Sequence, residues 1–277
     1  MEFPGRASEP GTIDDDTYNR IKDLIHNKCG ITLGPAKKAL VAARVRKRMR
    51  ELQITGHDEY FKAVIEDKTG VELVRLLDSI ATNVTSFYRE SGHFDVVKQA
   101  LSKWEDAGQT RFRLWSAACS SGEEAYTMAF TVKEALSARA DVKILATDIS
   151  TKVLGTAHQG IYEMEKTHSI PKDIKNKYMN KILSGDKEFM AVKSEIRNMV
   201  VYKRLNLTEM PFPMNGPLDV ILCRNVMIYF DKDLRRRLAV EFHRLLKPGG
   251  LLIIGLTESL IEISNDFKRI GSSVYIK

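Results

Sequence analysis

Cysteine is scarce in this 277-residue chain, and its three cysteines, Cys29, Cys119 and Cys223, form no CxxC pair. An odd and scattered set argues against a disulfide framework and against a zinc site. A chain without disulfides is typical of a reducing compartment, so we expect cytoplasmic localisation and no bound metal.

Long apolar runs are also missing, and none approaches the roughly 20 residues that span a bilayer. The longest candidate, Leu251–Leu256, is short and follows a Pro-Gly-Gly turn, which predicts a buried strand. Residues 1–12 contain glycine, proline and acids but no apolar core, so we interpret them as a flexible N-terminus rather than a signal peptide. No direct membrane insertion is expected.

Acidic residues are absent from one stretch of an otherwise mixed sequence. The net charge of +7 favours acidic partners. Segment 37–50 holds seven basic residues and no acid, whereas segment 51–90 holds eight acids and four bases. The positive charge is therefore a local patch.

The chain changes its pattern after about residue 90. Residues 13–90 predict a helical domain, because apolar residues recur at helical spacing after the acids at 14–16, along 40–49, after Gly56 and along 71–80. Residues 91–277 alternate between strands and helices, which predicts an α/β domain with a doubly wound, mostly parallel sheet. The predicted strands are 112–116, 142–148, 199–205, 218–223 and 251–255. Residues 158–200 are polar and lysine-rich, and we expect an inserted subdomain there.

A loop of small residues follows the first of these strands and leads into a helix at Glu123. Such a loop lets a ligand approach the backbone at the carboxyl end of a strand. Because Gly122 is its only glycine, the G-x-G-x-x-G dinucleotide motif is absent. Glu123 would repel a pyrophosphate and suit a cationic ligand, although an acid there could equally complement the helix dipole.

Two further strand ends carry polar residues. Asp148 ends the second predicted strand, where an acid commonly holds a ribose diol. Arg224 and Asn225 follow the strand at 218–223 inside an otherwise apolar run. A purely structural role for this pair would require another buried partner.

Four segments carry a resemblance to a known family. They are 79–90 (SIATNVTSFYRE), 116–124 (SAACSSGEE), 146–149 (ATDI) and 223–230 (CRNVMIYF). Their order, with Leu-Lys-Pro-Gly-Gly before the last strand, resembles the class I S-adenosylmethionine-dependent methyltransferase fold. The segments themselves resemble the CheR-type chemotaxis receptor (protein-glutamate) methyltransferases over nearly all of the chain. The sequence departs at 256–259 (LTES), where the family more often has a histidine before Ser-Glu-Ser.

The resemblance implies methyl transfer from S-adenosylmethionine to glutamate carboxylates of chemotaxis receptors, which leaves S-adenosylhomocysteine and glutamate methyl esters. It implies that Glu123 lies near the methionine moiety and that Asp148 binds the ribose. The implied cofactor-binding residues are Asn83, Thr85, Arg89, Glu123, Asp148, Asn206, Leu207, Arg224 and Asn225. The implied catalytic residues are Arg89, Arg224 and Tyr229, with Arg224 orienting the acceptor carboxylate.

The family's partner is the cytoplasmic helical bundle of methyl-accepting receptors, which is rich in glutamate. The basic patch therefore predicts a receptor-docking surface, formed by Arg44, Arg46, Lys47, Arg48 and Arg50. A solvated helix face without a partner is the plain alternative.

Two other functions compete with this prediction. A nucleic-acid methyltransferase is disfavoured because the Asn/Asp-Pro-Pro-Tyr/Phe motif is absent and no proline precedes Cys223, so we expect no nucleic-acid partner. A non-catalytic cofactor-sensing or receptor-docking protein is the second alternative.

Overall fold

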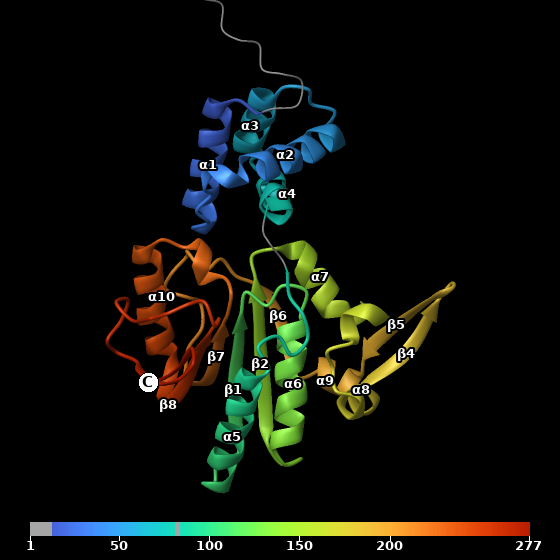
Figure 1. The fold of residues 1–277 in the computed structure, drawn as a ribbon, viewed down its shortest axis with the longest axis vertical. Coiled ribbons are helices and arrows are strands. Elements are labelled where there is room, and N and C mark those ends of the chain that lie inside the picture. Colours follow the sequence, from blue (N-terminus) through green and yellow to red (C-terminus); the bar gives the residue numbers. More distant parts are fainter. Residues whose placement is uncertain (1–12, 81–83) are drawn as a thin grey trace, which may run out of the picture. The chain divides into compact units, whose positions relative to one another are not determined.

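The computed structural model describes residues 13–80 and 84–277 (Figure 1). The chain divides into two compact units, Met1–Thr82 with Tyr229–Asp231, and Asn83–Ile228 with Lys232–Lys277. This division precedes the predicted boundary at residue 90. The reason is Phe87, which is fully buried and packs edge-on against Tyr162 in the second unit.

The first unit is helical, as predicted. Its elements are α1 (Asp15–Cys29), η1 (Pro35–Lys37), α2 (Lys38–Leu52), α3 (His57–Glu66) and α4 (Val71–Ile80). Asp14 caps α1 by accepting a hydrogen bond from the Thr17 amide at 2.8 Å. The apolar stripes of these helices meet in a core that includes Ile21, Val41 and Leu76.

The second unit contains a seven-stranded sheet. Its strands are β1 (Arg111–Ala117), β2 (Asp141–Asp148), β6 (Val200–Arg204), β7 (Leu218–Cys223), β8 (Leu246–Ile254), β9 (Lys268–Gly271) and β10 (Val274–Ile276). Their order is β6-β2-β1-β7-β8-β10-β9, and β10 runs antiparallel to both of its neighbours. The five predicted strands are confirmed. Because β1 lies between β2 and β7, the strand order reverses there, which is where such sheets bind ligands.

Helices flank this sheet, namely α5 (Gly92–Asp106), α6 (Glu123–Ala135), α7 (Thr151–Gln159) and α10 (Lys232–Leu245). Side chains alternate along β1, so opposite faces receive successive residues. Phe112 lies in the core formed with α5 and α6, whereas Trp115 packs edge-on against Phe212 and against Phe242 of α10. Both faces of β1 are thus buried, as expected for a central parallel strand.

A smaller sheet occupies residues 161–192, between α7 and β6 in the sequence. It contains β3 (Ile161–Glu163), β4 (Met179–Ser184) and β5 (Lys187–Val192), in the antiparallel order β3-β5-β4. The short helices η2 (Met164–Thr167), α8 (Lys172–Tyr178) and α9 (Ser194–Arg197) accompany it. Figure 1 shows the β4–β5 hairpin (yellow to orange) projecting from the side of the unit that carries α8 and α9.

Candidate active site

The loop at residues 118–122 joins β1 to α6 in a tight left-handed path. Ala118, Ser120 and Gly122 all have positive φ angles, of 64°, 49° and 95°. A Cβ atom at Gly122 would lie 2.7 Å from the Cβ of Ala157 and 3.0 Å from the Tyr162 hydroxyl. Only glycine fits this position, so the loop is held close to α7 and to the smaller sheet.

Asp148 anchors this loop to the end of β2. Its carboxylate accepts hydrogen bonds from the Ser120 amide at 2.8 Å and the Ser150 amide at 2.9 Å, and the residue is 7% exposed. The Cys119 amide also donates to the carbonyl of Thr147 at 2.8 Å. The carboxyl ends of β1 and β2 thus place Asp148 directly beside the small-residue loop.

Glu123, the first residue of α6, is 1% exposed. Its carboxylate accepts a hydrogen bond from the Ser121 hydroxyl at 2.7 Å. Within residues 13–80 and 84–277, no basic side chain forms an ion pair with it. A buried carboxylate normally has a compensating cation. The helix dipole compensates part of this charge, and the position suits a cationic ligand.

Asn206 and Leu207 lie in the loop after β6, next to the end of β2. The Leu205 amide donates to the Asp148 carbonyl at 3.0 Å, which fixes where this loop begins. The side-chain oxygen of Asn206 accepts from the Thr208 amide at 3.1 Å, and Leu207 is buried. The structure therefore brings both residues to the same edge of the sheet as Asp148.

Arg224 lies at the end of β7 between two carboxylates. Its guanidinium donates to Glu124 at 3.1 Å and to Glu90 at 3.0 Å, and it also donates to the Arg89 carbonyl. The side chain is 1% exposed. These contacts are the buried partners that a structural role for Arg224 requires, so its charge is already compensated inside the protein.

The two carboxylates respond differently to this shared cation. Burial raises the pKa of Glu124, although Arg224 and the Ser116 hydroxyl oppose the shift. Burial also acts on Glu90, but hydrogen bonds from Asn225 and Arg224 outweigh it and lower the pKa of Glu90. Glu90 is thus the firmly ionised partner of the pair.

The other predicted site residues fall in different places. Arg89 donates from its side chain to the Val84 carbonyl at 3.0 Å, and Thr85 is half-buried in the same segment. Asn83 lies outside the described residues. Tyr229 groups with the helical unit, where the Lys37 ammonium lies 4.6 Å from the centre of its ring.

The predicted docking surface needs one correction. Arg44, Arg46, Lys47 and Arg50 are exposed, but Arg48 is buried at 8% exposure. Its guanidinium forms a two-pronged ion pair with Glu72 of α4, at 3.0 and 2.6 Å, and also contacts Glu51. Arg48 therefore stabilises the helical unit and does not belong to its exposed surface.

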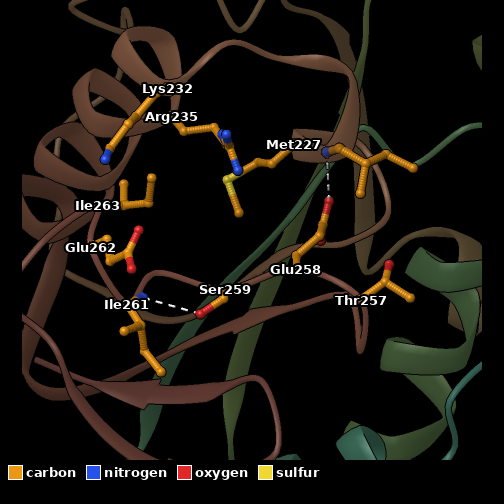
Figure 2. A pocket seen from close by; sticks show the side chains of 10 residues that line it. Met227, Lys232, Arg235, Thr257, Glu258, Ser259, Ile261, Glu262 and Ile263 are labelled. Atoms are coloured by element: carbon orange, nitrogen blue, oxygen red, sulfur yellow. Dashed lines mark hydrogen bonds between the residues drawn. The ribbon is translucent and has the colours of Figure 1, made fainter.

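A pocket of about 460 Å³ lies beyond the ends of β7 and β8 (Figure 2). Its lining residues are Met227, Ile228, Lys232, Arg235, Thr257, Glu258, Ser259, Ile261, Glu262 and Ile263. Glu90, Glu124 and Glu258 were not predicted as site residues, although they lie in the segments 79–90, 116–124 and 256–259. Their acidic character was the available signal, but Arg224, which binds Glu90 and Glu124, and Asn225, whose amide binds Glu258, come from other parts of the chain.

The alternative chemistries are a thiolate nucleophile at Cys223 and a metal site formed by acidic, histidine and cysteine side chains. Burial raises the pKa of the Cys223 thiol well above its usual value, which disfavours a thiolate nucleophile there. Among the described residues, no group of three or more His, Cys, Asp or Glu side chains could hold a metal ion, and no helix has the length and apolarity to cross a membrane.

Comparison with known families gives the assignment. Residues 83–276 match the model of the CheR methyltransferase SAM-binding domain, and residues 16–81 match that of the CheR methyltransferase all-alpha domain. The chain belongs to the CheR methyltransferase family. It is an S-adenosylmethionine-dependent methyltransferase of class I fold with an N-terminal all-helical domain, as the resemblance implied.

Relatives of similar length support this assignment. A chemotaxis protein methyltransferase of Borreliella burgdorferi is 38% identical over 90% of this chain and 89% of its own length. Chemotaxis protein methyltransferase 2 of Pseudomonas aeruginosa is 34% identical, over 94% and 92%. The chemotaxis protein methyltransferase of Klebsiella aerogenes is 35% identical, over 95% and 90%.

The chain's own residues fit S-adenosylmethionine. This cofactor combines a sulfonium, an ammonium and a carboxylate with a ribose, so its binding site requires acids at the ammonium and at the ribose hydroxyls in addition to donors for the carboxylate. Glu123, a buried carboxylate without an ion-pair partner among the described residues, meets the first requirement. Asp148 supplies a second acid at the end of the neighbouring strand. Gly122, which immediately precedes Glu123, lets the loop after β1 pack closely against Ala157 of α7 and Tyr162 of the smaller sheet.

Proposed function

We propose that this CheR methyltransferase esterifies glutamate side chains of chemotaxis receptors in sensory adaptation. The observation that carries the proposal is Glu123, a buried acid that follows the loop anchored by Asp148 and forms no ion pair in the described part of the chain. The acceptor follows from the relatives, which are named chemotaxis protein methyltransferases. Glu123 would hold the cationic end of the cofactor, Asp148 its ribose, and Asn206 and Leu207 would border its adenine.

The reaction needs little acid–base help from the protein. A glutamate acceptor is already ionised at neutral pH, so no general base is required. S-adenosylmethionine supplies an electrophilic methyl group when it is bound. The protein then aligns the acceptor and excludes water. These contributions are the ones expected when an anionic carboxylate reacts with a cationic sulfonium and both charges are lost.

Arg224 was expected to orient the acceptor carboxylate directly, and its ion pairs change this role to an indirect one. Its guanidinium is bound by Glu90 and Glu124, so an acceptor carboxylate would meet a compensated cation. A fully available arginine would pair tightly with the acceptor and reduce its nucleophilicity. We therefore assign Arg224 to orienting the 89–90 segment and the acceptor side of the site, with Arg89 and Tyr229 as the other groups near the reacting atoms. Thr85, Asn83 and Asn225 would complete the cofactor site.

The partner would be the cytoplasmic helical bundle of the receptor, which also places the enzyme in the cytoplasm. We assign docking to the exposed basic surface of α2, formed by Arg44, Arg46, Lys47 and Arg50. A hollow of about 500 Å³ adjoins it, lined by Ala43, Arg46, Met49, Arg50, Ile54 and Thr55. Positive charge around an apolar hollow suits an acidic amphipathic helix.

Transfer of a tritiated methyl group tests this function. Membranes that contain a methyl-accepting receptor should become labelled, and mild base should release the label as volatile methanol because esters hydrolyse there. Receptor with its acceptor glutamates changed to alanine is the control. Base-stable label in added RNA would instead indicate a nucleic-acid methyltransferase. Cofactor binding without label in any acceptor would indicate a non-catalytic protein.

A further inference from the structure

Glu258 joins the ends of two neighbouring strands through backbone hydrogen bonds. One carboxylate oxygen accepts from the Gly255 amide at 2.6 Å and from the Asn225 amide at 2.9 Å. The other accepts from the Ile228 amide at 3.2 Å. Gly255 directly follows β8, and Asn225 and Ile228 follow β7. A single side chain thus holds three amides from two strand ends.

The held backbone is an unusual one. Asn225 has a φ angle of 59°, in the left-handed region that asparagine adopts more readily than most residues with a side chain but that is still sparsely populated. The space beside it is also closed, because a Cβ atom on Gly255 would lie 2.6 Å from the side-chain nitrogen of Asn225. Such a turn persists only when its surroundings determine it, and the Glu258 carboxylate is the group that receives its amides.

This turn bears directly on the site. Arg224 precedes Asn225, and the Asn225 side chain donates to Glu90 at 3.2 Å. Ile228 forms part of the wall of the pocket in Figure 2, where Glu258 lies beside Met227. The segment that Glu258 fixes therefore connects the Arg224–Glu90 ion pair to the pocket beyond the sheet.

We propose that Glu258 is a positioning residue for methyl transfer, which sets the Arg224–Ile228 turn and thereby the acceptor side of the site. This inference rests on the proposed function for its kinetic readout. Glu258 is 8% exposed and its carboxylate accepts hydrogen bonds from three backbone amides. Its replacement should therefore disturb the conformation of residues 224–228 while the rest of the fold is retained. Burial raises the pKa of Glu258, although hydrogen bonds from backbone amides oppose this shift.

The test uses Glu258→Gln in the full chain. The glutamine side chain keeps one oxygen acceptor but places its NH2 group opposite at least one backbone N–H group. That hydrogen bond is lost, so the turn is held less firmly. We expect kcat for receptor methylation to fall about 10- to 100-fold, the usual result of a small misalignment, while the KM for S-adenosylmethionine changes by less than about threefold. Glu258→Asp, which keeps the charge on a shorter side chain, should recover part of the rate. Hydrogen exchange at the Asn225 and Ile228 amides should accelerate.

Glu241→Gln is the matched control. Glu241 is also a buried glutamate, and it accepts a backbone hydrogen bond from Phe212 at 2.7 Å, but it lies on α10 away from the site. It should lower stability without lowering kcat. If the two variants lose activity only in proportion to their loss of stability, or if exchange in the turn is unchanged, Glu258 has no positioning role. A wild-type chain that labels no receptor would refute the proposed function alone, and the exchange measurement would still decide whether Glu258 holds the turn.

Discussion

Asp148 combines two tasks in one carboxylate, because it holds the loop after β1 and faces the place proposed for the ribose. Replacing it with asparagine should weaken binding of S-adenosylmethionine and S-adenosylhomocysteine alike, by about 1.5–3 kcal/mol as for other hydrogen bonds to a charged group. Calorimetry with both ligands measures this. Asp219→Asn is the control, because Asp219 is a buried strand carboxylate that also accepts an amide, that of Arg113 at 2.7 Å. Unchanged affinity in Asp148→Asn would exclude its ligand role.

Arg48 and Arg44 are neighbours on α2 with opposite surroundings. Arg48→Ala leaves Glu72 as a buried charge without its partner, which should cost about 3–5 kcal/mol of unfolding free energy. Arg44→Ala removes an exposed side chain and should change it by less than about 0.5 kcal/mol. Urea denaturation compares the two. Equal effects would mean that the buried ion pair does not stabilise the helical unit.

The ionised Glu90 side chain contributes to the free energy of unfolding of the second unit, and this contribution depends on pH. Because the folded-state pKa of Glu90 is lowered, its contribution is fully present above the pKa of the unfolded chain and is lost as pH falls through the lower folded value. Glu90→Gln should therefore flatten the acid side of the stability profile. Thermal unfolding from neutral to acidic pH checks this, and a variant profile parallel to that of the wild type would contradict the assignment.

At the level of elements, the smaller sheet supports the cofactor loop. Tyr162 of β3 donates its hydroxyl to the Ser121 carbonyl at 2.8 Å, and Ser169 donates to the Phe87 carbonyl at 2.8 Å. Residues of the inserted segment thus hold both the loop before α6 and the segment that contains Arg89. The insertion is part of the framework of the site.

Tyr162→Phe tests this support. Loss of one buried hydrogen bond should reduce cofactor affinity by about 0.5–1.5 kcal/mol through a looser loop. Tyr178→Phe is the control in the same subdomain, because the Tyr178 hydroxyl contacts Glu134 rather than the loop. Titration with S-adenosylhomocysteine distinguishes them, and equal affinities would show that the loop is held without Tyr162.

The elements also show what the sequence could predict. The parallel strands and the small-residue loop are local patterns, so periodicity and composition identified them. Strands β9 and β10 were not predicted, since all four residues of β9 are exposed and its place depends on pairing with β10. The partners of Arg224 were not predicted either, because Glu90 lies 134 residues away in the sequence and Glu124 lies 100 residues away. Likewise, nothing local to α2 indicates that Glu72 pairs with Arg48.

For the whole molecule, the remaining basic surface of α2 should govern receptor recognition. Reversing Arg44 and Arg50 to glutamate should raise the KM for receptor and leave cofactor affinity intact, with a difference that shrinks as salt screens the charges. Initial rates at several salt concentrations measure this. Lys133→Glu with Arg139→Glu gives the same net charge change on exposed residues near the end of α6. If both double variants behave alike, net charge rather than the α2 surface attracts the receptor.

The contact between Arg224 and the 89–90 segment has a consequence for chimeras. Proteins of this family could be recombined by exchanging their all-helical domains, and the choice of crossover point decides which charges travel together. A junction at residues 82 and 83 leaves Glu90 in the same module as Arg224. A junction after Ser91 would import Glu90 from the donor and make one of the two counter-charges of this guanidinium depend on foreign sequence.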